Sequence, residues 1–259
     1  MNIFAAVGRV TVDLLRANGR LFVFTMDAVT SIFRPPFYWS LLFQQMMRIG
    51  YFSLPVVGLT AFFTGGVLAL QIYIGASRYG AEQFVPTVVL VGILRELGPV
   101  IAGLMVAGRV AAAIAAELGT MRVTEQIDAL VTLATRPVKY LVVPRLVAAV
   151  ITMPILVAIA DSIGVLGGYV ASTQSLGFTG SIYINTTMGA LNDNDVMSGL
   201  IKAVFFGFII AMMGCYHGFH SKGGAQGVGA ATTSAVVTSS ILILAANYLL
   251  TNIFNFFNF

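Results

Sequence analysis

Apolar residues in this chain gather in five long runs, and short polar stretches separate each run from the next. Each run reaches the ~20 residues that an α-helix needs to cross the hydrocarbon core of a membrane. The pattern therefore predicts five membrane-spanning helices, near residues 51–74, 86–115, 141–172, 196–216 and 229–253. The third run is longer than a bilayer requires, so we expect either that Pro144 and Pro154 bend it or that it protrudes from the membrane.

Charged residues among the first 30 positions recur at spacings that keep them on one face of a helix. Apolar side chains fall largely elsewhere, so this segment is predicted to be an amphipathic helix lying in the membrane interface. The alternative is a soluble helix packed on a partner. Arg34-Pro35-Pro36 ends the helix, and the aromatic triplet after it is typical of an interfacial anchor. The charged face consists of Arg9, Asp13, Arg16, Arg20 and Asp27, and the triplet is Phe37-Tyr38-Trp39.

The composition agrees with a membrane protein, because 58% of the residues are hydrophobic and only 9% are charged. Soluble domains carry about 25% charged residues, and long apolar runs favour helices over a barrel. The predicted fold class is an all-α integral membrane protein, with an N-terminal interfacial helix and five transmembrane helices. No stretch is long enough for a second core, so residues 1–259 are interpreted as one domain, with an interfacial helix region at 1–48 and a helix bundle at 51–253.

The net charge of +4 would suit a nucleic-acid ligand, but the positions of the basic residues argue against one. Ten of the 14 Lys and Arg residues fall on one side in a five-span topology, three lie within spans, and only Arg78 is on the other side. Cytoplasmic loops carry this excess, so we predict a cytoplasmic N-terminus and a C-terminus across the membrane. The ten are Arg9, Arg16, Arg20, Arg34, Arg48, Arg122, Arg136, Lys139, Arg145 and Lys222.

The second span carries a charged pair, Arg95 and Glu96, and the fourth carries Lys202. A charge in the membrane costs roughly 2.5–3.5 kcal/mol on insertion scales, so a retained one is a candidate for function. A helix break or start at the following Gly98-Pro99 would leave backbone donors free. We hypothesise a headgroup site, in which a phosphate meets Lys202 and Arg95 while an amine meets Glu96. The alternatives are a structural ion pair for Arg95 and Glu96, and a Lys202 that snorkels to the interface.

A second polar cluster follows the second span, on the arginine-rich side. The sequence predicts a short charged helix over residues 117–128, which Thr120 or Thr124 could cap. Such a helix suits docking to a cytoplasmic protein, and a solvated connecting helix is the alternative. Its charged residues are Glu117, Arg122, Glu125 and Asp128.

Other chemistry finds little support in the sequence. The glycine-rich stretch 218–224 lacks the Gly-Lys-Ser/Thr ending of a phosphate-binding loop, so ATP cannot bind by that route. Cys215, His217 and His220 lie close together, but with no fourth ligand we expect no metal site. Asp161 in the third span would be costly if it faced lipid, so we expect it to be paired or to line a cavity, and the sequence does not identify its partner.

Three segments resemble the MlaE family of permeases: RELGPV (95–100), GRV (108–110) and above all AELGTMRVTEQIDAL (116–130). These permeases are the membrane subunits of ABC systems that move phospholipids between the inner and outer membranes of Gram-negative bacteria. The resemblance implies an inner-membrane permease homodimer that maintains outer-membrane lipid asymmetry. It also implies four kinds of partner: cytoplasmic ATPase subunits that bind ATP and Mg, a STAS-domain regulator, a periplasmic hexamer of MCE-domain subunits, and phospholipid. It implies no cofactor in this chain and no enzymatic activity of its own.

The resemblance also implies roles for particular residues. The helix after the second span couples to the ATPase in this family, and the dimer encloses a lipid cavity. Two alternatives stay open: a membrane scaffold that seats the MCE ring and the ATPase without forming the lipid path, and an ion-coupled transporter that uses Asp161 and Glu96. The matching coupling residues are Glu117, Arg122, Glu125, Gln126 and Asp128, and the matching lipid-binding residues are Arg95, Glu96, Lys202, Tyr79 and Leu68.

Overall fold

The computed structural model describes residues 3–256, and within residues 3–17 it describes the side chains of Val12, Leu15 and Arg16 only. Residues 1, 2 and 257–259 lie outside this part, as do the side chains of Arg9 and Asp13 from the predicted charged face. Residues 3–256 contain helices and no strand, which confirms the all-α fold class. The α-helices are α1 (Ile3–Ile32), α2 (Trp39–Ile49), α3 (Leu54–Ser77), α4 (Val85–Gly92), α5 (Gly98–Val106), α6 (Ala112–Val123), α7 (Gln126–Thr132), α8 (Val143–Ser175), α9 (Gly180–Ala190), α10 (Asp193–Phe219) and α11 (Gly224–Phe256).

Short 3₁₀ and π-helical turns join several of these helices. Two 3₁₀ turns, Tyr51–Ser53 and Glu82–Phe84, precede α3 and α4. Two π turns, Ile93–Leu97 and Ala107–Ala111, join α4 to α5 and α5 to α6, and a third, Val138–Val142, leads directly into α8. As a result, α4, α5 and α6 form one continuous helical stretch.

Five helical stretches are long and apolar enough to cross a membrane, as the sequence predicts. They extend beyond the apolar runs because the backbone keeps its helical hydrogen bonds where polar side chains reach the headgroup region. Asp193 and Asp195, for example, lie in the first turn of α10, where the side chain of Asn192 accepts from the backbone N–H of Asn194 at 3.2 Å. The five stretches are Trp39–Ser77, Glu82–Val123, Val138–Ser175, Asp193–Phe219 and Gly224–Phe256.

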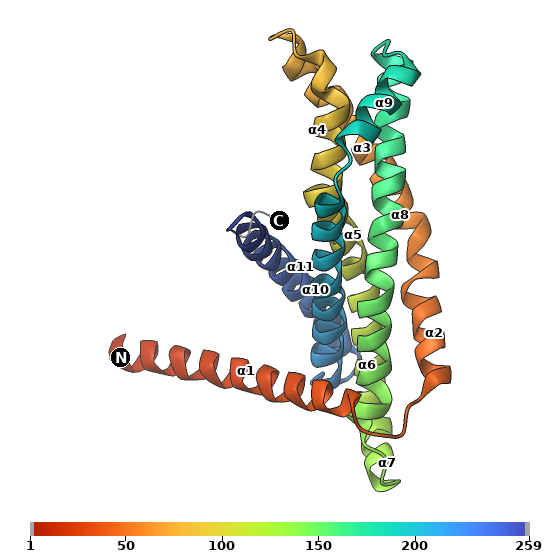
Figure 1. Cartoon of the computed structure of the whole chain (residues 1–259). Helices are drawn as coiled ribbons and strands as arrows, with labels where there is room; N and C mark the ends of the chain where they lie inside the picture. Colours follow the sequence, from red (N-terminus) through yellow and green to blue (C-terminus); the bar gives the residue numbers. More distant parts are fainter. Residues whose placement is uncertain (1–2, 257–259) are drawn as a thin grey trace.

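The first of these stretches begins earlier than predicted, at α2. Helix α2 packs along α8, as Figure 1 shows, and its Gln45 and Ile49 are buried. Residues 39–48, which the sequence pattern assigned to the interfacial region, therefore pack with the bundle. Hydropathy alone misses this because Gln44, Gln45 and Arg48 make the segment look polar.

The bundle is centred on α8, which packs against α3 on one side and α10 on the other. Pro144 lies at the beginning of α8, directly after the π turn Val138–Val142, and Pro154 lies inside α8. The helix continues through Pro154 to Ser175. The contact between α3 and α8 is close enough that a Cβ atom on Gly65 would collide with the carbonyl of Gly164. A Cβ atom on Gly167 would likewise collide with the carbonyl of Phe62.

Helix α1 leaves the bundle crosswise near one end (Figure 1). Its C-terminal part packs on the bundle: the buried Phe24 ring lies 5.7 Å from the rings of Tyr216 and Phe219. Leu15 and Val23 are 66% and 67% exposed although they are apolar. An arrangement of this kind suits a helix whose free apolar face meets lipid.

The two ends of the bundle carry short helices. Helix α7 projects at the end where α1 attaches, and α9 lies at the opposite end beside α4 (Figure 1). The sequence pattern treats residues 173–195 as a loop, whereas the structure has α9 there. An 11-residue helix is too short to be detected as a spanning run, and the buried Tyr183 and Thr187 hold it against the bundle.

Candidate functional site

A polar cluster lies inside the bundle around the carboxylate of Glu96, in the π turn between α4 and α5. Lys202 of α10 donates to Oε1 at 2.9 Å, and Thr251 of α11 donates to the same oxygen at 2.9 Å. Asn247, one turn before Thr251, donates its Nδ2 to Oε2 at 2.9 Å. Three helical segments therefore converge on one carboxylate, and both of its oxygens are hydrogen-bonded. We refer to Glu96, Lys202, Asn247 and Thr251 as the Glu96 cluster.

Lys202 is 1% exposed, and its ammonium points into the Glu96 cluster. Besides Glu96, it donates to the carbonyl of Arg95 at 2.7 Å and to the hydroxyl of Thr251 at 2.8 Å. A lysine has three donors, so this side chain has no donor left for a phosphate. The predicted arrangement, with Lys202 on a phosphate and Glu96 on an amine, is not the one in this structure because the two side chains bind each other. The inward direction of Lys202 also contradicts snorkelling.

The π turn explains why the carbonyl of Arg95 is available to Lys202. Pro99 has no N–H, so it cannot donate to the carbonyl four residues back, which is that of Arg95. The helix nevertheless does not break at Gly98-Pro99 as predicted, because the N–H of Gly98 bonds to the carbonyl of Ile93 and carries the helix through a wider turn. Turns of this type are frequent at functional sites.

Arg95 and Glu96 point to different partners, as adjacent residues of a helix do. The Nε of Arg95 lies 3.3 Å from Oδ1 of Asp195, which is in the first turn of α10. The Arg95 side chain remains 32% exposed and that of Asp195 11% exposed. This ion pair ties the second span to the beginning of α10, close in sequence to Lys202.

The structure brings three of the five predicted lipid-binding residues together, namely Arg95, Glu96 and Lys202. Leu68 of α3 lies against Gly92, at the edge of a small apolar cluster that includes Ile93. Tyr79 follows α3 in a turn and is 87% exposed. No described contact links Tyr79 to the Glu96 cluster.

Sequence reasoning missed three members of this site: Asp195, Asn247 and Thr251. Asn247 and Thr251 are separated by four residues and so share one face of α11. A polar pair at this spacing in an otherwise apolar span is a signal that could have found them. Asp195 carried no such signal, because it lies in a polar stretch that the hydropathy pattern reads as a loop.

A second polar cluster lies toward the other end of the same span and centres on Glu117 of α6. Its carboxylate pairs with Arg48 of α2 at 3.2 Å and with Arg145 of α8 at 3.0 Å. The Arg145 side chain is 5% exposed, so this pair lies against the core. Glu117 therefore joins three helices, in contrast with its predicted place on a separate docking helix.

The predicted helix over 117–128 is in fact the end of α6, a turn, and the beginning of α7. The turn is at Glu125, whose φ of 60° is left-handed, and Arg122 bridges it by an ion pair with Asp128 at 2.6 Å. Neither Thr120 nor Thr124 caps the beginning of a helix, because their hydroxyls donate to carbonyls four residues earlier in the chain. Thr124 instead occupies the C-terminal cap of α6.

Helix α7 combines one buried anchor with an exposed surface. Ile127 is 2% exposed and packs into the main core, whereas the side chains of Glu125, Gln126 and Asp128 are exposed. Four of the five predicted coupling residues thus lie at the projecting end of the bundle, and Glu117 lies deeper.

Asp161 is buried and, within the described part of the chain, its Oδ1 has no hydrogen-bond partner. It faces Gly98, where a Cβ atom would collide with the carboxylate. The His217 Nε2 lies 3.0 Å from the Thr238 hydroxyl, and among residues 3–256 no group of three His, Cys, Asp or Glu side chains could hold a metal ion.

Comparison with known proteins shows which family the chain resembles along most of its length. The family model described as "Permease MlaE" matches residues 42–253. The chain is 56% identical over 254 residues to a probable ABC transporter permease protein of Rickettsia bellii, with 98% of each chain covered. It is 32% identical over 254 residues to the intermembrane phospholipid transport system permease protein MlaE of Haemophilus influenzae, covering 98% of this chain and 97% of the relative. It is also 37% identical over 228 residues to the chloroplastic protein TRIGALACTOSYLDIACYLGLYCEROL 1 of Arabidopsis thaliana, and the match covers 88% of this chain and 65% of the relative.

Proposed function

The chain belongs to the MlaE family of ABC transporter permeases, and from this premise we propose that it moves phospholipids between the inner and outer membranes of a bacterium. It is a multi-pass permease subunit rather than the ATPase, so the energy of ATP reaches it from partner subunits. The proposed consequence of its activity is maintenance of outer-membrane lipid asymmetry. The name of the Haemophilus influenzae relative supports the choice of substrate.

The observation that carries this proposal is the Glu96 cluster. A carboxylate within a membrane span is costly, so one that is retained and held by donors from α10 and α11 is a candidate for function. The Glu96 side chain is still 39% exposed, so one side of it can meet a headgroup while the other side stays bonded. We assign headgroup contact to Arg95 and Glu96, a lining role to Leu68 and Tyr79, and to Lys202 the positioning of Glu96.

The second part of the proposal concerns how the ATPase is coupled to this chain. The exposed residues of α7 and of the preceding turn, Glu125, Gln126 and Asp128, would receive an ATPase subunit that binds ATP and Mg. Arg122 holds the turn through Asp128, and Glu117 would pass movement on to α2 and α8 through its two arginines. The chain itself needs no cofactor in this scheme.

The remaining partners and the orientation are part of the same proposal. A second copy of this chain would complete the lipid cavity, an MCE-domain hexamer would meet the end that carries α9, and a STAS-domain regulator would bind the ATPase. The N-terminus would be cytoplasmic and the C-terminus periplasmic in the inner membrane. The positive-inside distribution of Lys and Arg residues supports this orientation.

A scaffold without a lipid path is the second candidate. It is favoured by the size of the cavity beside Ile93 and Gly98, which has a volume of only about 10 Å³ in one copy of the chain. A lipid path through this region therefore requires a second copy, a movement of the helices, or both, and a scaffold requires neither.

The deciding experiment compares Glu96→Gln with Glu82→Gln in the complex reconstituted with its ATPase and MCE partners. Glu82 is exposed in the turn before α4 and serves as the matched control. We expect Glu96→Gln to reduce ATP-driven transfer of labelled phospholipid by at least tenfold while the ATPase stays bound, and Glu82→Gln to transfer at the wild-type rate. Wild-type transfer by Glu96→Gln would refute the headgroup assignment. Transfer that continues after a proton gradient is collapsed, and stops without ATP, would exclude ion coupling.

A further inference from the structure

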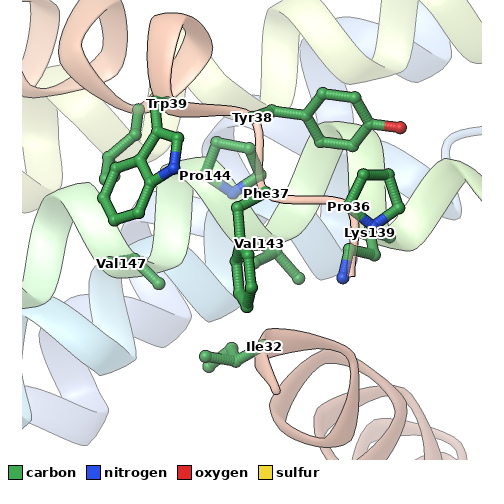
Figure 2. A pocket seen from close by; sticks show the side chains of 10 residues that line it. Ile32, Pro36, Phe37, Tyr38, Trp39, Lys139, Val143, Pro144 and Val147 are labelled. Carbon is green, nitrogen blue, oxygen red and sulfur yellow. The ribbon is translucent and has the colours of Figure 1, made fainter. Parts of the chain in front are cut away.

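A cavity of about 190 Å³ lies where the end of α1, the linker to α2 and the beginning of α8 meet. Figure 2 shows it from close by, with Ile32 on one side, Val143, Pro144 and Val147 of α8 behind, and Phe37 and Trp39 around it. Nine of the ten residues that line it are apolar or aromatic, and the tenth is Lys139. None of these residues belongs to the Glu96 cluster or to the Glu117 ion pairs.

Lys139 is the unusual member of this lining. Its side chain is 7% exposed, and its ammonium donates to the carbonyl of Ser31 at 3.1 Å and lies 5.3 Å from the centre of the Phe37 ring. Among the side chains that the structure describes, no carboxylate forms an ion pair with it. A buried charge normally has a counter-ion, and this one retains donors for an anion.

The apolar part of the cavity indicates what the anion is attached to. An apolar cavity of roughly 150 Å³ takes up a benzene-sized hydrocarbon, so this one accommodates a segment of acyl chain. The exposed Phe37 and Trp39 beside it are residue types that concentrate at the level of lipid headgroups. The exposed Arg34 and Arg136 lie two and three residues before the lining residues Pro36 and Lys139, and they add positive charge on the side predicted to be cytoplasmic. Basic pockets on the cytoplasmic side of membrane proteins bind anionic headgroups.

We propose that this cavity binds one anionic phospholipid of the cytoplasmic leaflet, with its phosphate on Lys139 and part of an acyl chain among Phe37, Val143 and Val147. The proposal goes beyond transport, because the lipid here is a resident ligand and not cargo. Such a lipid would fix α1 against α8, since Lys139 already bonds to the last turn of α1. It would thereby set the direction in which α1 leaves the bundle.

Trp39, the only tryptophan in the chain, makes this site directly measurable. The full chain, purified in a mild detergent, is titrated with phosphatidylglycerol that carries bromine on its acyl chains, and the fluorescence of Trp39 is followed. We expect saturable quenching at one lipid per chain, with tighter binding than for brominated phosphatidylcholine, whose headgroup has no net charge. Equal binding of the two lipids would refute the anionic site.

Two variants test the geometry, and each has a matched control. Lys139→Gln should weaken the saturable binding about tenfold, as expected for the loss of one charge-assisted hydrogen bond, whereas Lys222→Gln, at an exposed lysine outside the cavity, should not. Val147→Phe should abolish the binding by filling the cavity, whereas Ile151→Phe, at an exposed position one turn along α8, should leave it intact. Identical curves for wild type, Lys139→Gln and Val147→Phe would mean that only surrounding lipid reaches Trp39. Reversal of the quenching by inorganic phosphate at matched ionic strength would mean a small anion in place of the lipid.

Discussion

Lys202 donates to the hydroxyl of Thr251 at 2.8 Å while both residues also donate to one oxygen of Glu96 at 2.9 Å. Three side chains from three helical segments thus form a closed set of hydrogen bonds. Because each member has two partners in the set, removal of one leaves each of the other two with one hydrogen bond fewer. This dependence is the basis of the first prediction.

Lys202→Met should lower the free energy of unfolding by on the order of 2 kcal/mol. Loss of one partner from a fully buried ion pair costs about 3–5 kcal/mol, and the partial exposure of Glu96 reduces the loss. The double variant Lys202→Met/Glu96→Gln should recover part of this stability, because no unpaired carboxylate remains. Denaturant unfolding of the purified chain would measure both, and a double variant less stable than Lys202→Met would contradict the interpretation.

Gly65→Ala should destabilise the chain by about 1–3 kcal/mol, the usual cost of overpacking a close contact. The added Cβ would strike the carbonyl of Gly164 across the contact between α3 and α8. The neighbouring Gly66→Ala is the control, because its Cβ would lie 3.5 Å from the nearest atom, an ordinary contact distance. Equal midpoints of thermal unfolding for the two variants would show that the helices do not approach as closely as described.

Glu117→Gln should lower the free energy of unfolding by on the order of 1–2 kcal/mol. The substitution removes the counter-ion of Arg145, whose side chain is 5% exposed. Glu125→Gln serves as the comparison, since Glu125 is exposed and has no ion pair among the described residues. Denaturant unfolding of both variants is the measurement, and loss of stability at Glu125 alone would reverse the assignment of the two residues.

The double variant Glu125→Lys/Asp128→Lys should lose the ATPase on co-purification and retain bound phospholipid. The reason is that both side chains are exposed at the projecting end of the bundle, far along the second span from the Glu96 cluster. Glu82→Lys, at the opposite end of that span, should retain both. Retention of the ATPase by the double variant would show that α7 is not the docking element, and absence of lipid from the wild type would favour the scaffold.

The spans were predictable because a membrane imposes a length and an apolar composition on every helix that crosses it. The same criterion fails for α9, which is too short, and for α2, whose glutamines and arginine hide its packing on α8. The sequence predicted one helix through Glu125 because the residue types around it do not distinguish a left-handed turn from a continuing helix. A glycine at this position would have indicated such a turn.

The candidate site was predictable only in part. Arg95, Glu96 and Lys202 stand out as charges in apolar spans, so each could be selected alone. Their pairing could not, because Glu96 and Asn247 are 151 positions apart in the chain and only the packing of α10 and α11 brings them together. Lys202, which was predicted to contact a phosphate, therefore bonds to Glu96, which was predicted to contact an amine.

The reciprocal glycine contact between α3 and α8 has a mechanical consequence. Gly65 receives a carbonyl from α8 and Gly167 receives one from α3, so axial sliding of either helix would force backbone atoms together. Sliding of these two helices past each other is therefore blocked, and we expect α3 and α8 to move together as one rigid body. Arg145 lies near one end of α8 and α9 follows the other end. Under the proposed coupling at Glu117, a displacement at the α7 end of the bundle would therefore tilt α3 and α8 together at the α9 end.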